Sequence, residues 1–211
     1  MSPSAENIRD IPWVEKYRPR SLRAVASQSL TIQSLQEFVN KRALPHLIFT
    51  GPAGTGKTST AISLINDLVG SKNLTQDVLL ERNASDESRM QDLPSIKNFV
   101  FHTGIAENTT FKFVVLDEAD NLSNEVQSAF RRIIETAPPN VKFIFMCNYV
   151  ENIIDPLISR CAIFRFYPLP RPEFEKQILH IAKNEEVPIN KGILDAIYYI
   201  SQGDMRLAIN L

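Results

Sequence analysis

A glycine-rich run ending in a lysine and a threonine is the segment of this sequence best suited to chemistry. Residues 51–58 read Gly-Pro-Ala-Gly-Thr-Gly-Lys-Thr, which satisfies the pattern G-x-x-x-x-G-K-[ST]. Glycines let backbone N–H groups close around phosphate oxygens, and a helix that begins near Lys57 adds its positive dipole. Lys57 would neutralise the β- and γ-phosphates of a nucleotide, and the Thr58 hydroxyl would hold Mg²⁺. The alternative is a glycine-rich turn without a ligand. The nucleotide-binding residues predicted here are Gly51, Pro52, Ala53, Gly54, Thr55, Gly56, Lys57, Thr58 and Ser59.

Two acidic residues follow an apolar run about 60 residues further along the chain. Residues 113–116 are Phe-Val-Val-Leu, and Asp117 and Glu118 come next. An apolar strand ending in two acids places both carboxylates at the carboxyl edge of a sheet, where ligands bind in open α/β folds. Asp117 would complete the Mg²⁺ shell with Thr58, and Glu118 would orient and activate the attacking water. Taken alone, such a pair can be only the polar start of a loop. After a phosphate-binding loop it predicts hydrolysis of a nucleoside triphosphate, and these motifs do not exclude GTP.

Two further polar residues stand where a nucleotide site could use them. Asn148 directly follows the apolar run 141–147, so it would lie at the same sheet edge, close to the γ-phosphate; otherwise it starts a turn. Arg160 follows a short predicted helix with Asp155 as its cap and Pro156 at its first position. Without further information, that arginine is a solvated surface charge.

The elements that must position these residues alternate between apolar runs rich in β-forming residues and helical patterns. This alternation predicts an α/β fold with a mostly parallel sheet. Ser123 is placed to cap the helix over 124–136, whose apolar residues have helical spacing. The expected strands are 47–50, 78–81, 111–116, 141–147 and 162–166, and the expected helices among them are 31–40, 58–69, 93–101 and 124–136.

The pattern changes after residue 167. Pro168, Pro170 and Pro172 interrupt the chain, and three helical segments follow without strands, at 173–184, 191–201 and 204–211. We therefore predict a nucleotide-binding α/β domain over 1–167 and a small all-α lid domain over 168–211. The last helix reaches the end of the sequence, so we expect a truncated lid and a fragment of a longer protein.

Composition excludes several classes of protein. With 23 Lys+Arg against 24 Asp+Glu the net charge is −1, so any contact with nucleic acid must be local. Apolar runs are far shorter than the roughly 20 residues of a membrane span, and residues 1–10 lack a signal-peptide core, so we expect an intracellular protein. Cys147 and Cys161 have neither a C-x-x-C partner nor a histidine at ligand spacing, and both are interpreted as buried or partly buried thiols.

Taken together, these motifs resemble the small subunits of replication factor C, the AAA+ clamp loader of eukaryotes and archaea, over nearly the whole chain. The similar segments are 13–19 (Trp-Val-Glu-Lys-Tyr-Arg-Pro), the phosphate-binding loop, 83–87 (Asn-Ala-Ser-Asp-Glu), 116–120 (Leu-Asp-Glu-Ala-Asp), 130–132 (Phe-Arg-Arg), 147–149 (Cys-Asn-Tyr), 159–161 (Ser-Arg-Cys) and 203–206 (Gly-Asp-Met-Arg). The Ser-Arg-Cys segment is the most specific of these. The phosphate-binding loop and the acidic segment are shared by many ATPases.

The resemblance assigns roles to further residues. It implies an adenine pocket lined by Val14, Tyr17, Arg18 and Pro19, with Gln28 nearby. It makes Asn148 a sensor of the γ-phosphate and Arg206 a second sensor that reaches the same phosphate from the lid. Arg160 becomes an arginine finger that completes the ATP site of a neighbouring subunit. The chain is thus expected to be an ATP hydrolase that binds ATP or ADP with Mg²⁺ and works within a multi-subunit ring.

The resemblance also implies partners. Family members form hetero-pentamers with other replication factor C subunits, open a ring-shaped sliding clamp and load it on primer-template DNA during replication. They continue into a helical collar that this sequence lacks. The implied location is the nucleus in a eukaryote and the cytoplasm in an archaeon. An AAA+ remodeller or a helicase-loading initiation ATPase remains the alternative, since it would use the same nucleotide motifs.

The segment after Asn-Ala-Ser-Asp-Glu departs from the family pattern. Pro94 is expected to delay the start of the next helix. Arg89 and Lys97 stay as candidate contacts to DNA phosphates, and Arg131 and Arg132 match the family better, although one of that pair could serve a neighbouring ATP site. The apolar residues at 96 and 99–101 could contact the clamp or pack in the core.

Overall fold

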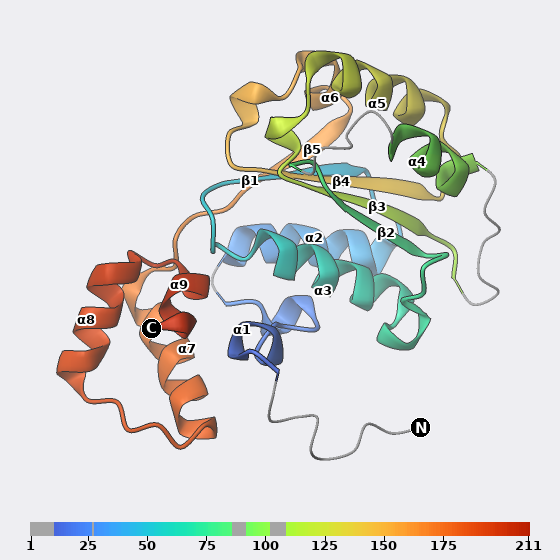
Figure 1. Ribbon diagram of the computed structural model, residues 1–211. Helices are drawn as coiled ribbons and strands as arrows, with labels where there is room; N and C mark the ends of the chain where they lie inside the picture. Colours follow the sequence, from blue (N-terminus) through green and yellow to red (C-terminus); the bar gives the residue numbers. More distant parts are fainter. Residues whose placement is uncertain (1–10, 27, 86–91, 102–108) are drawn as a thin grey trace.

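The core of the molecule is a five-stranded parallel sheet with the strand order β2-β3-β4-β1-β5 (Figure 1). This computed structural model describes residues 11–26, 28–85, 92–101 and 109–211. The strands are β1 (His46–Thr50), β2 (Leu79–Asn83), β3 (Lys112–Asp117), β4 (Val141–Cys147) and β5 (Cys161–Arg165). The predicted α/β fold with a parallel sheet is confirmed, and each strand lies within two residues of its predicted position.

The three central strands are apolar along almost their whole length because both faces of the sheet are covered. Every residue of β4 except Lys142 is buried, and β1 and β3 are buried apart from one end residue each. The edge strands β2 and β5 contain exposed residues instead. Thr50 pairs with Cys147 and Asn83 with Asp117, so the carboxyl ends of neighbouring strands meet at one edge of the sheet.

Helices cover both faces of the sheet. In Figure 1, α2 and α3 lie below it, while α4, α5 and α6 lie above it. Each side has its own apolar cluster: Leu47, Phe49 and Leu64 belong to the first, and Phe130 and Phe143 belong to the second. The helices are α1 (Trp13–Lys16), α2 (Ser29–Lys41), α3 (Lys57–Val69), α4 (Asp92–Phe101), α5 (Asn124–Thr136), α6 (Asp155–Ile158), α7 (Arg171–Asn184), α8 (Lys191–Ser201) and α9 (Met205–Asn210), with short 3₁₀ turns η2 (Leu22–Ala24), η3 (Ser71–Asn73), η4 (Ala119–Asn121) and η5 (Val150–Asn152).

Most helix boundaries follow the sequence signals, with one correction. Ser123 caps α5 as predicted, since its side chain accepts a hydrogen bond from the Val126 N–H. Pro94 does not delay α4, because that helix already begins at Asp92. Proline is tolerated there since N–H groups of the first helical turn have no partner within the helix.

Helices α7, α8 and α9 form a separate group beside the sheet (Figure 1). Their small core contains Leu169, Phe174, Ile178, Leu194 and Ala208. Asn190 caps α8 and Asp204 caps α9 through side-chain oxygens. Ala26 from the amino-terminal segment also packs on this core, so contacts cross the boundary expected near residue 168, and the division into two domains stays a prediction.

Both cysteines are free thiols. Cys147 is buried and Cys161 is partly buried, as predicted, and burial raises the pKa of Cys147 to about 11 and that of Cys161 to about 12. Within the described ranges, no helix is long and apolar enough to cross a membrane.

A buried glutamine connects α5 with the chain that follows β4. Gln127 is 1% exposed, and its Nε2 donates to the Leu122 carbonyl at 3.0 Å and the Asn152 carbonyl at 2.9 Å. Its Oε1 accepts from the Ile154 N–H at 2.8 Å. One side chain therefore satisfies three backbone groups and fixes the segment between Asn148 and Arg160 on α5.

Replacing Gln127 with leucine should lower the free energy of unfolding by about 2–4 kcal/mol, because buried backbone groups lose their partners at about 1–3 kcal/mol each and can partly rearrange. Urea unfolding measures this change. Gln33→Leu, an exposed position on α2, is the matched control and should stay within about 0.5 kcal/mol of the parent. Equal stabilities of the two variants would contradict the assignment.

Candidate functional site

The glycine-rich loop connects β1 with α3 and places Lys57 at the first turn of the helix. Gly51 has φ +148°, and a Cβ there would lie 2.2 Å from the Phe166 carbonyl oxygen, so only glycine fits. Lys57 is 8% exposed, and its Nζ donates to the Gly51 and Pro52 carbonyl oxygens at 2.6 and 2.9 Å. Burial lowers the pKa of this ammonium, which Asp117 partly opposes.

Asn148 follows β4 at the expected sheet edge and lies beside that ammonium. Its Oδ1 accepts a hydrogen bond from Lys57 Nζ at 3.1 Å. The backbone around Asn148 is held by Asp120, whose Oδ2 accepts from the N–H groups of Asn148 and Tyr149 at 3.1 Å each. Asp120 stands in the acidic segment found in the sequence, although its role there was not predicted.

The two predicted Mg²⁺ ligands are in contact. Thr58 Oγ1 donates to Asp117 Oδ2 at 3.2 Å. A hydroxyl and a carboxylate oxygen are the hard donors that Mg²⁺ prefers, and a nucleotide would supply phosphate oxygens beside them. The residues present therefore fit a magnesium–nucleotide complex. Among residues 11–26, 28–85, 92–101 and 109–211, no group of three or more His, Cys, Asp or Glu side chains is arranged to hold a metal ion.

Glu118 adopts a backbone conformation that is unusual outside glycine. Its φ is +53°, its N–H donates to Asp117 Oδ1 at 2.9 Å, and its Oε2 accepts from Asn121 at 3.2 Å. Such strain costs about 1–3 kcal/mol and persists where surrounding contacts fix it. Glu118 lines the pocket together with Asp117 and Asn148.

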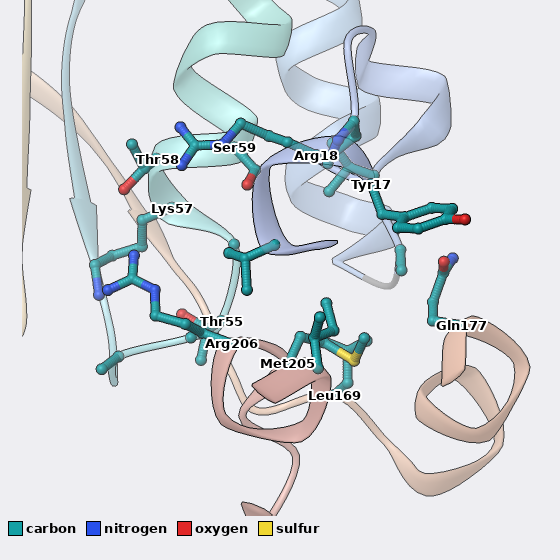
Figure 2. A pocket seen from close by; sticks show the side chains of 18 of the residues that line it. Tyr17, Arg18, Thr55, Lys57, Thr58, Ser59, Leu169, Gln177, Met205 and Arg206 are labelled. Atoms are coloured by element: carbon teal, nitrogen blue, oxygen red, sulfur yellow. The ribbon is translucent and has the colours of Figure 1, made fainter. Parts of the chain in front are cut away.

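Helix α9 sits directly on the glycine-rich loop. The Met205 N–H donates to the Gly54 carbonyl at 3.3 Å. A Cβ on Gly54 would lie 1.7 Å from Asp204 Oδ1, the oxygen that caps α9 through Leu207 N–H. This contact brings Arg206 into the pocket near Lys57 (Figure 2), as expected for a residue that senses the phosphates.

The same pocket continues between the amino-terminal segment and α7. Val14, Tyr17, Arg18 and Pro19 line it, as the resemblance implies. Gln28, which the resemblance places only nearby, is not among the lining residues; its Nε2 donates to the Tyr167 carbonyl at 2.6 Å and holds the linker between β5 and α7. Lining residues that the sequence did not reveal are Ala24, Val25, Ala26, Leu169, Gln177, Ile181, Met205 and Ile209.

Tyr17 also joins this segment to the far end of α7. Its hydroxyl donates to Glu185 Oε1 at 2.6 Å, and Lys16 Nζ lies 2.6 Å from the same oxygen. The Tyr17 ring meets His180 edge to face. No local sequence pattern indicates these contacts because the partners stand about 168 positions apart.

Arg160 lies away from this pocket. It follows α6, is 35% exposed, and its Nη2 lies 2.5 Å from Glu135 Oε1. Arg160 and Lys57 of the same chain are therefore not in one site. An arginine that completes the ATP site of a neighbouring subunit must lie apart from its own site in this way.

The candidate DNA-contacting residues differ in how exposed they are. Arg89 lies outside the described residues, Lys97 and Arg132 are exposed, and Arg131 is partly buried with Nε 4.0 Å from Glu135. In α4, Ile96, Phe99 and Val100 pack in the core, and only Phe101, 40% exposed, stays available for a partner.

This fold and site are those of a phosphate-binding-loop protein, the class that binds nucleoside triphosphates. Residues 47–169 match the family model described as ATPase family associated with various cellular activities (AAA), and the chain belongs to that family. In fold it is similar to the Thermotoga maritima RuvB Holliday junction branch migration motor, with a TM-score of 0.73 and 20% identity, covering 92% of this chain and 63% of that one.

Curated relatives make the similarity more specific and confirm the resemblance seen in the motifs. The chain is 46% identical over 199 residues to a replication factor C small subunit of Archaeoglobus fulgidus, covering 94% of this chain and 61% of the relative. It is 44% identical over 212 residues to the one of Staphylothermus marinus, covering 100% and 64%. The chain thus spans about three fifths of the length of these relatives.

The contact between Gly54 and Asp204 predicts different costs for two loop substitutions. Gly54→Ala and Gly56→Ala both force a left-handed backbone, at about 1–2 kcal/mol each. At Gly54 the new Cβ also forces Asp204 out of its capping position, which adds about 1 kcal/mol. At Gly56 a Cβ meets nothing within 4 Å, so no such cost arises. Urea unfolding without nucleotide should rank Gly54→Ala as the less stable variant, and the reverse order would refute the contact.

Proposed function

We propose that this chain is the nucleotide-hydrolysing part of a clamp-loader small subunit, which uses ATP to open a sliding clamp and load it on primed DNA. The observation that carries the proposal is a pair of hydrogen bonds at one sheet edge, from Lys57 to Asn148 and from Thr58 to Asp117. Relatives named replication factor C small subunit support the choice of this class within the AAA family.

Each residue at this edge has a distinct task in hydrolysis. Backbone N–H groups of the loop and the Lys57 ammonium hold the β- and γ-phosphates. Thr58 and Asp117 would hold Mg²⁺, which neutralises phosphate charge when bound. Glu118 accepts a proton from water as the water oxygen attacks the γ-phosphorus, the bond from that phosphorus to the β–γ bridging oxygen breaks, and ADP and phosphate result.

Asn148 and Arg206 report whether the γ-phosphate is present. Asn148 is hydrogen-bonded to Lys57, and Arg206 enters from α9, which rests on Gly54. A γ-phosphate between them attracts Arg206 and so helps to keep α9 on the loop, and release of the phosphate frees the lid to move.

Arg160 serves the ATP site of an adjacent subunit in this proposal. Its guanidinium is exposed, and its hydrogen-bond partners among the described residues are surface groups of its own chain, namely Glu135, Ser159 and the Pro156 carbonyl. The partners are the other subunits of a hetero-pentamer, a sliding clamp and the backbone of primer-template DNA. Of the candidate DNA contacts named above, Lys97 and Arg132 are described and exposed, so they are available for local phosphate contacts.

Two substitutions should separate nucleotide binding from hydrolysis. Lys57→Ala should weaken MgATP binding strongly because the phosphates lose their buried positive charge. Glu118→Gln should bind MgATP normally but slow hydrolysis about 10²–10⁴-fold, since an amide cannot accept the proton. Equilibrium binding and single-turnover hydrolysis in the purified complex with partner subunits measure both. Wild-type hydrolysis by Glu118→Gln would refute its role.

Substitution of Arg160 should affect a different subunit. In the complex, Arg160→Ala should leave the affinity of its own site for ATP unchanged and slow hydrolysis at the neighbouring site about 10³-fold or more, because such arginines stabilise transition-state charge. Site-resolved single turnover, with each subunit silenced in turn, measures this effect.

Arg23→Ala is the matched control for loss of an exposed arginine and should change neither site. Impaired hydrolysis only at the site that contains Lys57 of the same chain would show that Arg160 acts within its own chain and would exclude a finger in trans.

A further inference from the structure

The pocket has two ends of different chemistry, and nothing so far explains how its far end would distinguish one base from another. At one end stand Lys57, Thr58, Asp117, Asn148 and Arg206, which suit phosphates and Mg²⁺. The other end lies between Tyr17 and α7 (Figure 2). A nucleotide whose phosphates occupy the first end must place its base toward the second.

This second end is mostly apolar. Aliphatic side chains from four separate segments line it, which suits the two faces of a flat purine ring. Its members are Val14, Val25, Ala26, Leu169, Ile181, Met205 and Ile209.

Polar side chains at the base end are few. The Tyr17 hydroxyl donates to Glu185, and Arg18 Nη2 lies 2.6 Å from Glu15. The buried Arg18 Nε has no hydrogen-bond partner among the described residues, but a guanidinium can only donate. Gln177 lies on α7, one helical turn before Ile181, and its amide has no hydrogen-bond partner among the described residues. Figure 2 shows this amide pointing from α7 toward the Tyr17 ring. A partly buried amide in an apolar pocket is suited to a ligand that supplies the missing partners.

The charges of the pocket favour adenine over guanine as that ligand. Guanine recognition benefits from a carboxylate that accepts the base's N–H groups, but the lining carboxylates Asp117 and Glu118 stand at the phosphate end. An amide both donates and accepts, which matches the N7 acceptor and the 6-amino donor that adenine presents on one edge. Guanine presents two acceptors on the same edge, N7 and O6. The amide nitrogen could donate to N7, but the amide oxygen would then face O6 without a hydrogen between them.

We propose that Gln177 is the side chain that selects adenine, its amide oxygen accepting from the 6-amino group and its amide nitrogen donating to N7. This inference rests on the proposed function, in which the site takes ATP, and adds the residue that reads the base. It assigns to the lid a direct contact with the base, in addition to the phosphate contact of Arg206.

The test is a set of affinities for Mg²⁺-nucleoside diphosphates, measured by calorimetry on the chain and on its Gln177→Leu variant. The parent should bind MgADP about tenfold or more tightly than MgGDP. Gln177→Leu should bind MgADP about tenfold less tightly, and its preference for MgADP over MgGDP should fall to about twofold or less. Gln33→Leu, on exposed α2, should behave as the parent.

Base analogues identify the atoms involved. Purine riboside diphosphate lacks the 6-amino group and 7-deaza-ADP lacks the N7 acceptor, so each should bind the parent more weakly than ADP and should lose little further affinity in Gln177→Leu. Gln177→Glu, which keeps the shape and can accept but not donate, should regain the 6-amino contact while tolerating loss of N7.

The outcomes separate this inference from the function on which it rests. Equal affinity of the parent for MgADP and MgGDP, or an unchanged preference in both Gln177 variants, would overturn the role of Gln177 and leave nucleotide binding intact. Failure of the parent to bind either nucleotide would overturn both.

Discussion

The rest of this structure depends on one buried positive charge. The Lys57 ammonium is almost fully removed from water, and such a charge is stable only when polar groups surround it. Its acceptors come from two neighbouring strands: the carbonyls of Gly51 and Pro52 follow β1, and the Asn148 side chain follows β4. The adjacency of β1 and β4 in the sheet, the tight turn at Gly51 and the start of α3 at Lys57 are all needed to assemble this one set of contacts.

The pocket is enclosed by three parts of the chain that are distant in sequence. The amino-terminal segment reaches α7 through Tyr17 and Glu185, α9 rests on the loop at Gly54, and Gln28 holds the linker at Tyr167. A molecule bound between them touches all three at once. Its binding energy therefore depends on the position of the helical group relative to the sheet, which is the physical condition for coupling between ligand state and shape.

Local chemistry made the sheet, the loop and the acidic pair predictable. Apolar runs such as β4 have few alternatives to a buried strand, and Ser123 before an amphipathic pattern defines the start of α5. Contacts between distant residues left no such pattern. The contact between Gly54 and Asp204, the three hydrogen bonds of Gln127 and the hydrogen bond from Gln28 to the linker carbonyl of Tyr167 form only after folding. The expectation that Pro94 delays α4 was wrong because a proline in the first turn is compatible with a helix.

The pairing of Arg160 with Glu135 has a consequence for the chain when it is alone. An exposed guanidinium without a counter-charge attracts phosphates of any origin, including those of nucleic acids. Glu135 occupies Arg160 at little energetic cost, because an exposed pair contributes only about 0–1 kcal/mol and exchanges readily. A doubly charged phosphate presented in the right orientation can displace the carboxylate, whereas an isolated backbone phosphate competes with it on nearly equal terms. The ion pair thereby lowers the affinity of this surface for every anion by the same small free energy before any partner is present.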